Sequence, residues 1–262
     1  RDVTGTIQSI PLICGSIMSK KIAEGIQGLV LDVKTGNGAF MKTPTQARDL
    51  ADHLIRIGTD FGVKTDTVFT SMNQPLGDNA GLWCEMLESI NCLRGGGPDD
   101  TMAVTYKLGA RLLIQAGIAD SEEAAISLLQ SLIADGQAWN KFLEVADFQG
   151  GDIKVFSNPE QQHKPLYARD FLAPATGYIE AMDTYKIGLA IVSLGCGRLK
   201  SDDAIDPTGG MEFVHKIGAA VNRGDVLIRC FNSNSDKLDQ AVALLDGTIS
   251  IGTNKVEHQL FL

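Results

Sequence analysis

The sequence lacks the features that would place it in a specialised class of protein. No stretch of 18 uncharged apolar residues occurs, so we predict no membrane span. Basic residues are in deficit, with 23 Lys and Arg against 32 Asp and Glu, which argues against nucleic acid as the main partner. There is no internal repeat and no low-complexity segment. Hydrophobic residues make up 44% of the chain and charged residues 21%, which is typical of a globular protein with a substantial core.

Common metal and redox motifs are also missing. The five cysteines are widely spaced without a Cys-x-x-Cys pair, and the four histidines show no metal-ligand spacing. Free thiols in a reducing cytosol are the simpler interpretation, so we expect a cytoplasmic protein without a cofactor. The chain begins at Arg1 without a signal segment, and residues 1–8 are typical of the interior of a longer protein. We therefore expect a partial chain.

Helix and strand signals alternate along the first part of the chain, and the pattern changes near residue 165. Capping residues and apolar spacing predict helices over 11–23, from Thr43 onward, and over 79–92, 100–117, 121–136 and 137–148. Apolar, β-branched runs predict buried strands over 28–36 and 63–72. Later, short strands and turns surround helices over 183–195 and 235–245, with a last strand over 247–252. The order predicts an α/β region followed by an α+β region.

One candidate site combines Arg1, Ser16 and Lys20. Ser16 and Lys20 lie four residues apart and share one face of the first predicted helix, and Arg1 precedes the proline that opens it. A guanidinium, a hydroxyl and an ammonium together suit a small planar ligand with carbonyl oxygens. On spacing alone, the simpler interpretation is that Lys20 stabilises the helix C-terminus and Ser16 only packs.

Two further candidates follow predicted strands. Asp32 and Lys34 stand inside an apolar strand, where charges are costly unless paired, and a Gly-Asn-Gly turn follows at the end where open α/β sheets bind ligands. A simple turn is the alternative, since no third glycine completes a dinucleotide fingerprint. Within 72–88, loop carbonyls and Glu88 could hold a hard monovalent or divalent cation, although a turn and a solvated helix face explain the same residues.

Taken together, five runs resemble the pyrimidine nucleoside phosphorylase family. They are RDVT (1–4), SIPLICGSIMSKK (9–21), GLVLDVKTGNGAFM (28–41), MNQPLG (72–77) and GYIEAMDTYKIG (177–188). The resemblance covers nearly the whole chain. It implies an α/β fold class made of a remnant of the helical pyrimidine-binding domain (1–24), a central α/β domain with a mixed sheet (25–157) and a C-terminal α+β domain (158–262).

The resemblance also implies an activity and roles for single residues. The activity is the reversible phosphorolysis of a pyrimidine nucleoside, such as thymidine, with phosphate as co-substrate. Arg1 and Lys20 would be catalytic, because cationic donors stabilise the charge that develops on the departing base. Ser16 would orient the base. The apolar pocket at the pyrimidine 5-position would consist of Ile7, Ile13 and Phe40.

A structural monovalent cation is a further implication, held by Leu76, Asn79 and Glu88. Asn79 replaces a small apolar residue of the family, so only its carbonyl would serve. The family's phosphate-binding runs, Lys-His-Ser-Thr-Gly-Gly and Ser-Gly-Arg-Gly, do not occur in these 262 residues. Their absence predicts little activity from this chain alone. The resemblance itself implies a homodimer for the full-length protein. A nucleotide phosphorylase, a phosphoribosyltransferase and a non-enzymatic structural fragment are the alternatives.

Overall fold

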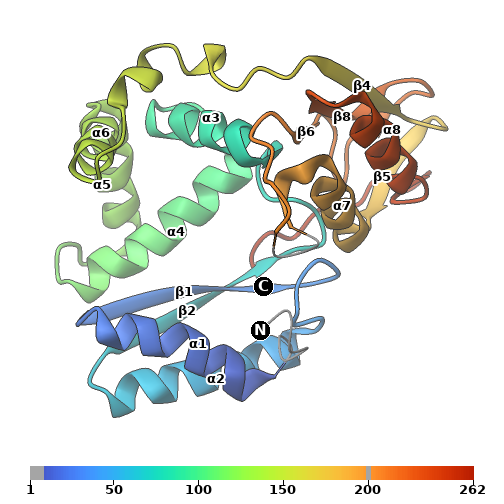
Figure 1. Ribbon diagram of the computed structural model, residues 1–262. Helices are drawn as coiled ribbons and strands as arrows, with labels where there is room; N and C mark the ends of the chain where they lie inside the picture. The colour runs from blue at the N-terminus through green and yellow to red at the C-terminus, as the bar shows by residue number, and fades with distance from the viewer. Residues whose placement is uncertain (1–8, 199–201) are drawn as a thin grey trace. The chain divides into compact units, whose positions relative to one another are not determined.

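The structure is a computed structural model that describes residues 9–198 and 202–262 (Figure 1). The described residues form two compact units. The first unit contains the described residues up to Met72 together with Ala103–Leu129 and Gln259–Leu262. The second unit contains Asn73–Met102 and Gln130–His258. The three domains predicted from the sequence differ in extent from these units and stay a prediction.

A pair of parallel strands is the centre of the first unit. Strand β1 (Gly28–Thr35) pairs with β2 (Lys64–Ser71) in a register that sets Lys34 opposite Thr70. Helices α1 (Ile10–Ala23) and α2 (Pro44–Asp60) lie on one side of the two strands (Figure 1). The crossover from β1 to β2 through α2 is the usual βαβ connection of parallel strands.

Local sequence explains where these two helices begin. Pro11 stands in the first turn of α1, where its missing N–H costs no hydrogen bond. At the start of α2, Thr43 and Gln46 form a reciprocal capping box. The helices then bury an apolar core against β1, in which Met18 is 1% exposed and Leu54 2% exposed. Burial of such a side chain contributes about 1.5–3 kcal/mol.

The second unit contains two antiparallel sheets. One has the strand order β3-β6-β8-β4 and the other β7-β5-β9. Helices α7 (Thr184–Ile191) and α8 (Ser235–Leu244) pack with these strands around a separate core. The strands are β3 (Asn79–Gly81), β4 (Tyr167–Leu172), β5 (Gly177–Met182), β6 (Gly210–Phe213), β7 (Ala220–Val221), β8 (Val226–Asn232) and β9 (Ile249–Gly252).

The remaining elements are helical. In chain order they are α3 (Leu82–Leu93), α4 (Asp99–Gln115), α5 (Glu122–Ala134), α6 (Gln137–Phe148), the 3₁₀ turns Ile153–Ser157 and Pro159–Gln161, and the π turn Val192–Cys196. The part of α4 inside the first unit reaches β1, because the side-chain amide of Gln115 donates to the Leu29 carbonyl at 3.4 Å.

The predicted α/β fold class is confirmed, with differences in detail. The helix predicted over 79–92 begins only at Leu82, because Asn79–Gly81 pairs with β6 as a strand. Strand β6 itself was not predicted. The helix predicted over 183–195 changes to a π turn after Ile191, where Gly195 takes a φ of 85°. In the central sheet, β1 and β2 are parallel, and an antiparallel bridge joins Thr70 of β2 to Phe261.

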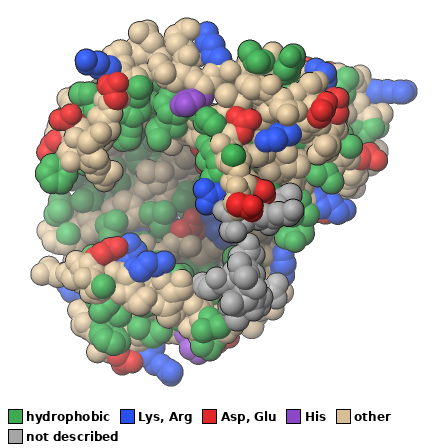
Figure 2. Space-filling view, in the orientation of Figure 1, with side chains coloured by type: hydrophobic (Ala, Val, Ile, Leu, Met, Phe, Trp, Pro, Cys, Tyr) green, Lys and Arg blue, Asp and Glu red, His purple; other side chains and the backbone are tan. Residues whose placement is uncertain are grey.

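Acidic and basic side chains are interspersed on the face shown in Figure 2. Among the described helices, none combines the length and the apolar character needed to cross a membrane.

Candidate functional site

A cavity of about 460 Å³ lies in the first unit, between α1, the end of β1 and the loop that follows β1. Its walls are mainly apolar, and the charged side chains that line it among the described residues are Asp32 and Lys34. The apolar lining includes Ile13, Ile17, Leu31, Phe40, Met41 and Met72. A mainly apolar cavity with a few converging polar groups is the usual form of a small-molecule site.

One stripe of α1 connects the cavity with the predicted base-binding residues. Ile13, Ser16, Ile17 and Lys20 follow the spacing i, i+3, i+4 and i+7, which places them along one helix face. Ile13 and Ile17 line the cavity. Ser16 is half-buried and Lys20 exposed. The stripe therefore sets a hydroxyl and an ammonium beside an apolar wall.

The loop after β1 is held by its backbone and presents Phe40. The Gly38 N–H donates to the Met72 carbonyl at 3.0 Å, and the Gly36 N–H to the Met41 carbonyl at 3.1 Å. Gly36 has a φ of 126°, a conformation that favours glycine. Phe40 lines the cavity and is nevertheless 60% exposed. Its exposed ring is available to contact a planar ligand.

The charges inside β1 are paired. Lys34 Nζ lies 2.5 Å from Asp32 Oδ2 and donates to Thr70 Oγ1 at 2.8 Å. The Thr70 hydroxyl, which is fully buried, donates in turn to Asp32 Oδ1 at 2.5 Å. The three side chains thus close a ring at the carboxyl end of the parallel strands.

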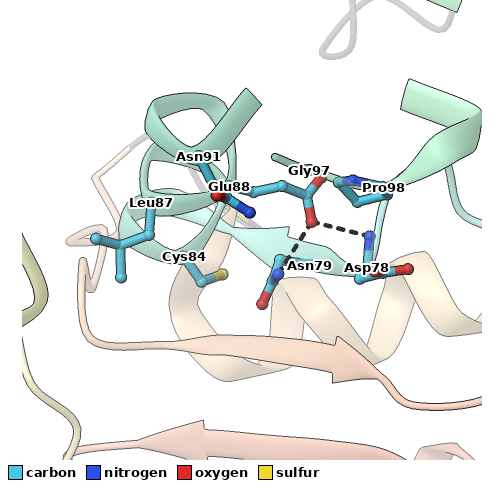
Figure 3. Close-up of a pocket in the computed structure, with 8 residues that line it drawn as sticks. All are labelled: Asp78, Asn79, Cys84, Leu87, Glu88, Asn91, Gly97 and Pro98. Carbon is cyan, nitrogen blue, oxygen red and sulfur yellow. Dashed lines mark hydrogen bonds between the residues drawn. The ribbon is translucent and has the colours of Figure 1, made fainter. Parts of the chain in front are cut away.

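A second cavity, of about 440 Å³, lies in the second unit and is lined by the glutamate of the predicted cation site (Figure 3). Glu88 Oε2 accepts from the Asp78 N–H at 2.9 Å and from the Asn79 side-chain amide at 3.0 Å. Burial raises the pKa of the Glu88 carboxyl, and the hydrogen bond from Asn79 opposes this rise. Two N–H donors therefore satisfy one oxygen that a cation would use.

Lys216 anchors the other side of the same turn. Its ammonium donates to the Gly77 carbonyl at 3.0 Å and to Asp100 Oδ2 at 2.7 Å, and lies 3.3 Å from Asp78 Oδ1. The side chains of Lys216 and Asp100 are 17% and 16% exposed. Burial lowers the pKa of nearby His258, and the charge of Lys216 adds to this effect while that of Asp100 opposes it. The turn is thus fixed by opposite charges.

The structure brings together only part of the predicted sites. Ile13 and Phe40 share the cavity of the first unit, and Ser16 and Lys20 share the helix face beside it. Arg1 and Ile7 lie outside the described residues. In the second unit, the Asn79 side-chain amide donates to Glu88 Oε2 at 3.0 Å. The roles of all these residues, including Leu76, stay predictions.

Two sets of contacts were missed by reasoning from the sequence. Thr70 was not singled out, although the parallel register of the two predicted strands would have set it near Lys34. Lys216 and Asp100 are 116 positions apart, and no local pattern links them.

Comparisons with known proteins agree with the resemblance. Residues 1–139 match the family model described as glycosyl transferase family, a/b domain. Residues 178–252 match the model of the pyrimidine nucleoside phosphorylase C-terminal domain. Pyrimidine-nucleoside phosphorylases of Staphylococcus aureus strains USA300, COL and Mu50 are each 42% identical over 260 residues, 99% of this chain. The chain spans 60% of the length of these relatives. Two family models in succession and this identity show that the chain belongs to the pyrimidine nucleoside phosphorylase family.

Proposed function

We propose that the protein is a pentosyltransferase that cleaves pyrimidine nucleosides with phosphate. In this reaction an oxygen of phosphate bonds to the sugar C1′ while the bond from C1′ to the base nitrogen breaks. The bonding electron pair leaves with the base, is spread over its carbonyl oxygens and is finally protonated. The observation that carries the proposal is the α1 stripe, which sets Ser16 and Lys20 beside an apolar cavity that Phe40 also lines.

Each group of the stripe has a chemical task in this proposal. Ser16 exchanges hydrogen bonds with the base and fixes its orientation. Lys20 holds an ammonium where negative charge grows, and so lowers the barrier more than it strengthens ground-state binding. Arg1 supplies a second cationic donor by the family resemblance. Ile13 and Phe40 enclose the 5-position, together with Ile7 by the same resemblance, and an apolar enclosure favours the methyl group of thymidine.

We further propose a cytoplasmic homodimer that acts in nucleoside salvage. The family resemblance supports this proposal. Because the phosphate-binding runs do not occur in these residues, we propose that the chain alone binds the base but turns over little nucleoside.

The test compares Lys20→Ala with a matched neighbour, Lys21→Ala. Lys21 pairs with Glu24 at 3.1 Å and lies off the stripe, so its loss removes the same charge without touching the site. Calorimetric titration with thymine and thymidine should show binding that Lys20→Ala weakens and Lys21→Ala leaves unchanged. In a protein of the relatives' length, phosphate-dependent release of thymine should fall about 30- to 1,000-fold in Lys20→Ala only.

Four outcomes would contradict parts of the proposal. Absence of binding to the unaltered chain would contradict the base site. Equal losses in the two variants would show a general charge effect. Phosphate-dependent turnover by this chain at the rate of a longer phosphorylase would contradict its expected low activity, while preference for a nucleotide would favour the related nucleotide-processing enzymes.

A further inference from the structure

The proposed function uses the base-binding stripe and the apolar wall of the cavity, but it leaves its charged end without a task. Asp32 and Lys34 are charged side chains of the lining. Their side chains are 19% and 28% exposed, so each retains a face toward solvent or a ligand. They lie at the carboxyl end of the parallel strands, the edge at which open α/β sheets bind their ligands.

A contribution to the stability of the fold does not by itself explain why Asp32 and Lys34 are paired here. Removing two charges from water costs several kcal/mol per ion, and apolar residues of similar volume often serve equally well in such a place. Val33 and Leu29 of the same strand belong to the apolar core, and the buried polar side chains at the carboxyl ends of the two strands, Thr35, Thr70 and Ser71, carry no charge. A charged pair beside a ligand-sized cavity therefore calls for a further polar partner, which the described residues do not supply.

The ring of hydrogen bonds leaves unused capacity on both charges. Lys34 has three N–H donors, and within the described part of the chain two of them go to Asp32 and Thr70. Each oxygen of Asp32 accepts one hydrogen bond and has room for another. Thr70 is buried between them and fixes both side chains, because it accepts from one and donates to the other.

Charge balance identifies the chemical class of the missing partner. The carboxylate repels a phosphate, and the ammonium repels a metal ion, so an ion of either sign meets a like charge within the pair. A neutral hydroxyl has one donor and two acceptor positions, and so it donates to Asp32 while accepting from Lys34. A ligand with an apolar or planar part and a hydroxylated part matches the cavity from end to end.

We infer that Asp32 and Lys34, held in place by Thr70, bind a hydroxyl group of the nucleoside's pentose. The inference rests on the proposed function, in which the apolar wall and the α1 stripe take the base in the same cavity. Asp32 and Lys34 are then specificity residues that distinguish a nucleoside from a free base. Thr70 is a positioning residue, since its hydroxyl is occupied by the other two side chains.

The experiment compares a base with its nucleoside in three forms of the chain. Dissociation constants for thymine, thymidine and a nucleoside without the 3′-hydroxyl are measured by calorimetric titration. The test variant is Asp32→Asn with Lys34→Met, which removes both charges together and leaves no unpaired ion. The control is Glu122→Gln with Lys107→Met, a pair in the same unit with a 2.7 Å contact and 28% and 34% exposure that does not line the cavity.

We expect the test variant to lose at least tenfold in affinity for thymidine and to keep its affinity for thymine. The control should keep both. Thr70→Val should lose less affinity for thymidine than the test variant does. Thr70→Ser should keep the affinity of the unaltered chain, because serine keeps the hydroxyl.

Several results would overturn the inference. An unchanged ratio of thymidine to thymine affinity in the test variant would refute it, and equal losses for both ligands would assign the pair a structural role. Binding of inorganic phosphate that the test variant abolishes would show that the end of the cavity takes an anion. If thymine binds the unaltered chain, the proposed function survives each of these results. If neither thymine nor thymidine binds it, the proposed function and this inference fail together.

Discussion

The turn at Gly77 offers a quantitative test of how the second unit is held together. Gly77 has a φ of 76°, and a Cβ added there would stand 2.1 Å from Glu88 Oε1. Gly77→Ala therefore forces a left-handed alanine and also displaces the carboxylate that binds Asp78 and Asn79. Gly136 is the matched position, with a φ of 75° in the same unit and no atom within 4 Å of an added Cβ.

The two costs can be separated. A left-handed alanine costs about 1–2 kcal/mol, and this is the whole effect expected for Gly136→Ala. Gly77→Ala adds the loss of the two hydrogen bonds to the half-buried Glu88, at about 1 kcal/mol each. We therefore expect Gly77→Ala to lower the free energy of unfolding by about 2 kcal/mol more than Gly136→Ala.

Urea unfolding followed by tryptophan fluorescence suits this comparison. Both tryptophans, Trp83 and Trp139, belong to the second unit, so the signal reports that unit. The slope against urea should stay constant while the midpoint shifts. If the two variants are equally destabilised, the Glu88 carboxylate does not hold the turn, and the hydrogen bonds described for it carry no net stability.

Two other predictions concern the same unit. Two N–H donors already occupy Oε2 of Glu88, and Asn79→Ala removes one of them. Replacing tetramethylammonium chloride with potassium chloride at equal ionic strength should therefore raise the melting temperature of Asn79→Ala more than that of the unaltered chain. An equal or larger rise in the unaltered chain would instead support the cation site implied by the resemblance. The lowered pKa of His258 predicts a contribution to stability that is present above about pH 6.5 and is lost as the pH falls through the folded-state value. His258→Asn should flatten the fall in unfolding free energy between pH 7.5 and 5, and an unchanged slope would assign that fall to other groups.

The parts of the fold that local chemistry determines were predictable. Thr43, Pro44 and Gln46 carry the capping signals of α2 in their own side chains, and the structure shows that capping box. The spacing of Ser16 and Lys20 on one helix face follows from helix geometry alone. Such features depend on residues within one or two turns of each other.

The missed features depend on partners that are distant in the chain. Asn79–Gly81 became a strand because β6, more than 120 residues later, pairs with it. The side-chain amide of Asn79 turned toward Glu88, a choice that depends on how α3 is placed after the turn. Lys216 pairs with Asp100 because the fold brings together residues that lie 116 positions apart in the chain. Tertiary contacts of this kind override local propensity, and a single sequence contains no signal for them.

Burial of the thiols has a consequence for chemical labelling. Burial raises the pKa of Cys84 and of Cys230 to about 12, and Cys230 is completely enclosed. Since the thiolate is the reactive form, only about one in 10⁵ of such thiols is ionised at pH 7 in the folded chain. Alkylation of the enclosed Cys230 must therefore wait for opening of the second unit, and its rate measures how often that unit opens under native conditions. The rate of this alkylation is therefore an internal measure of local unfolding.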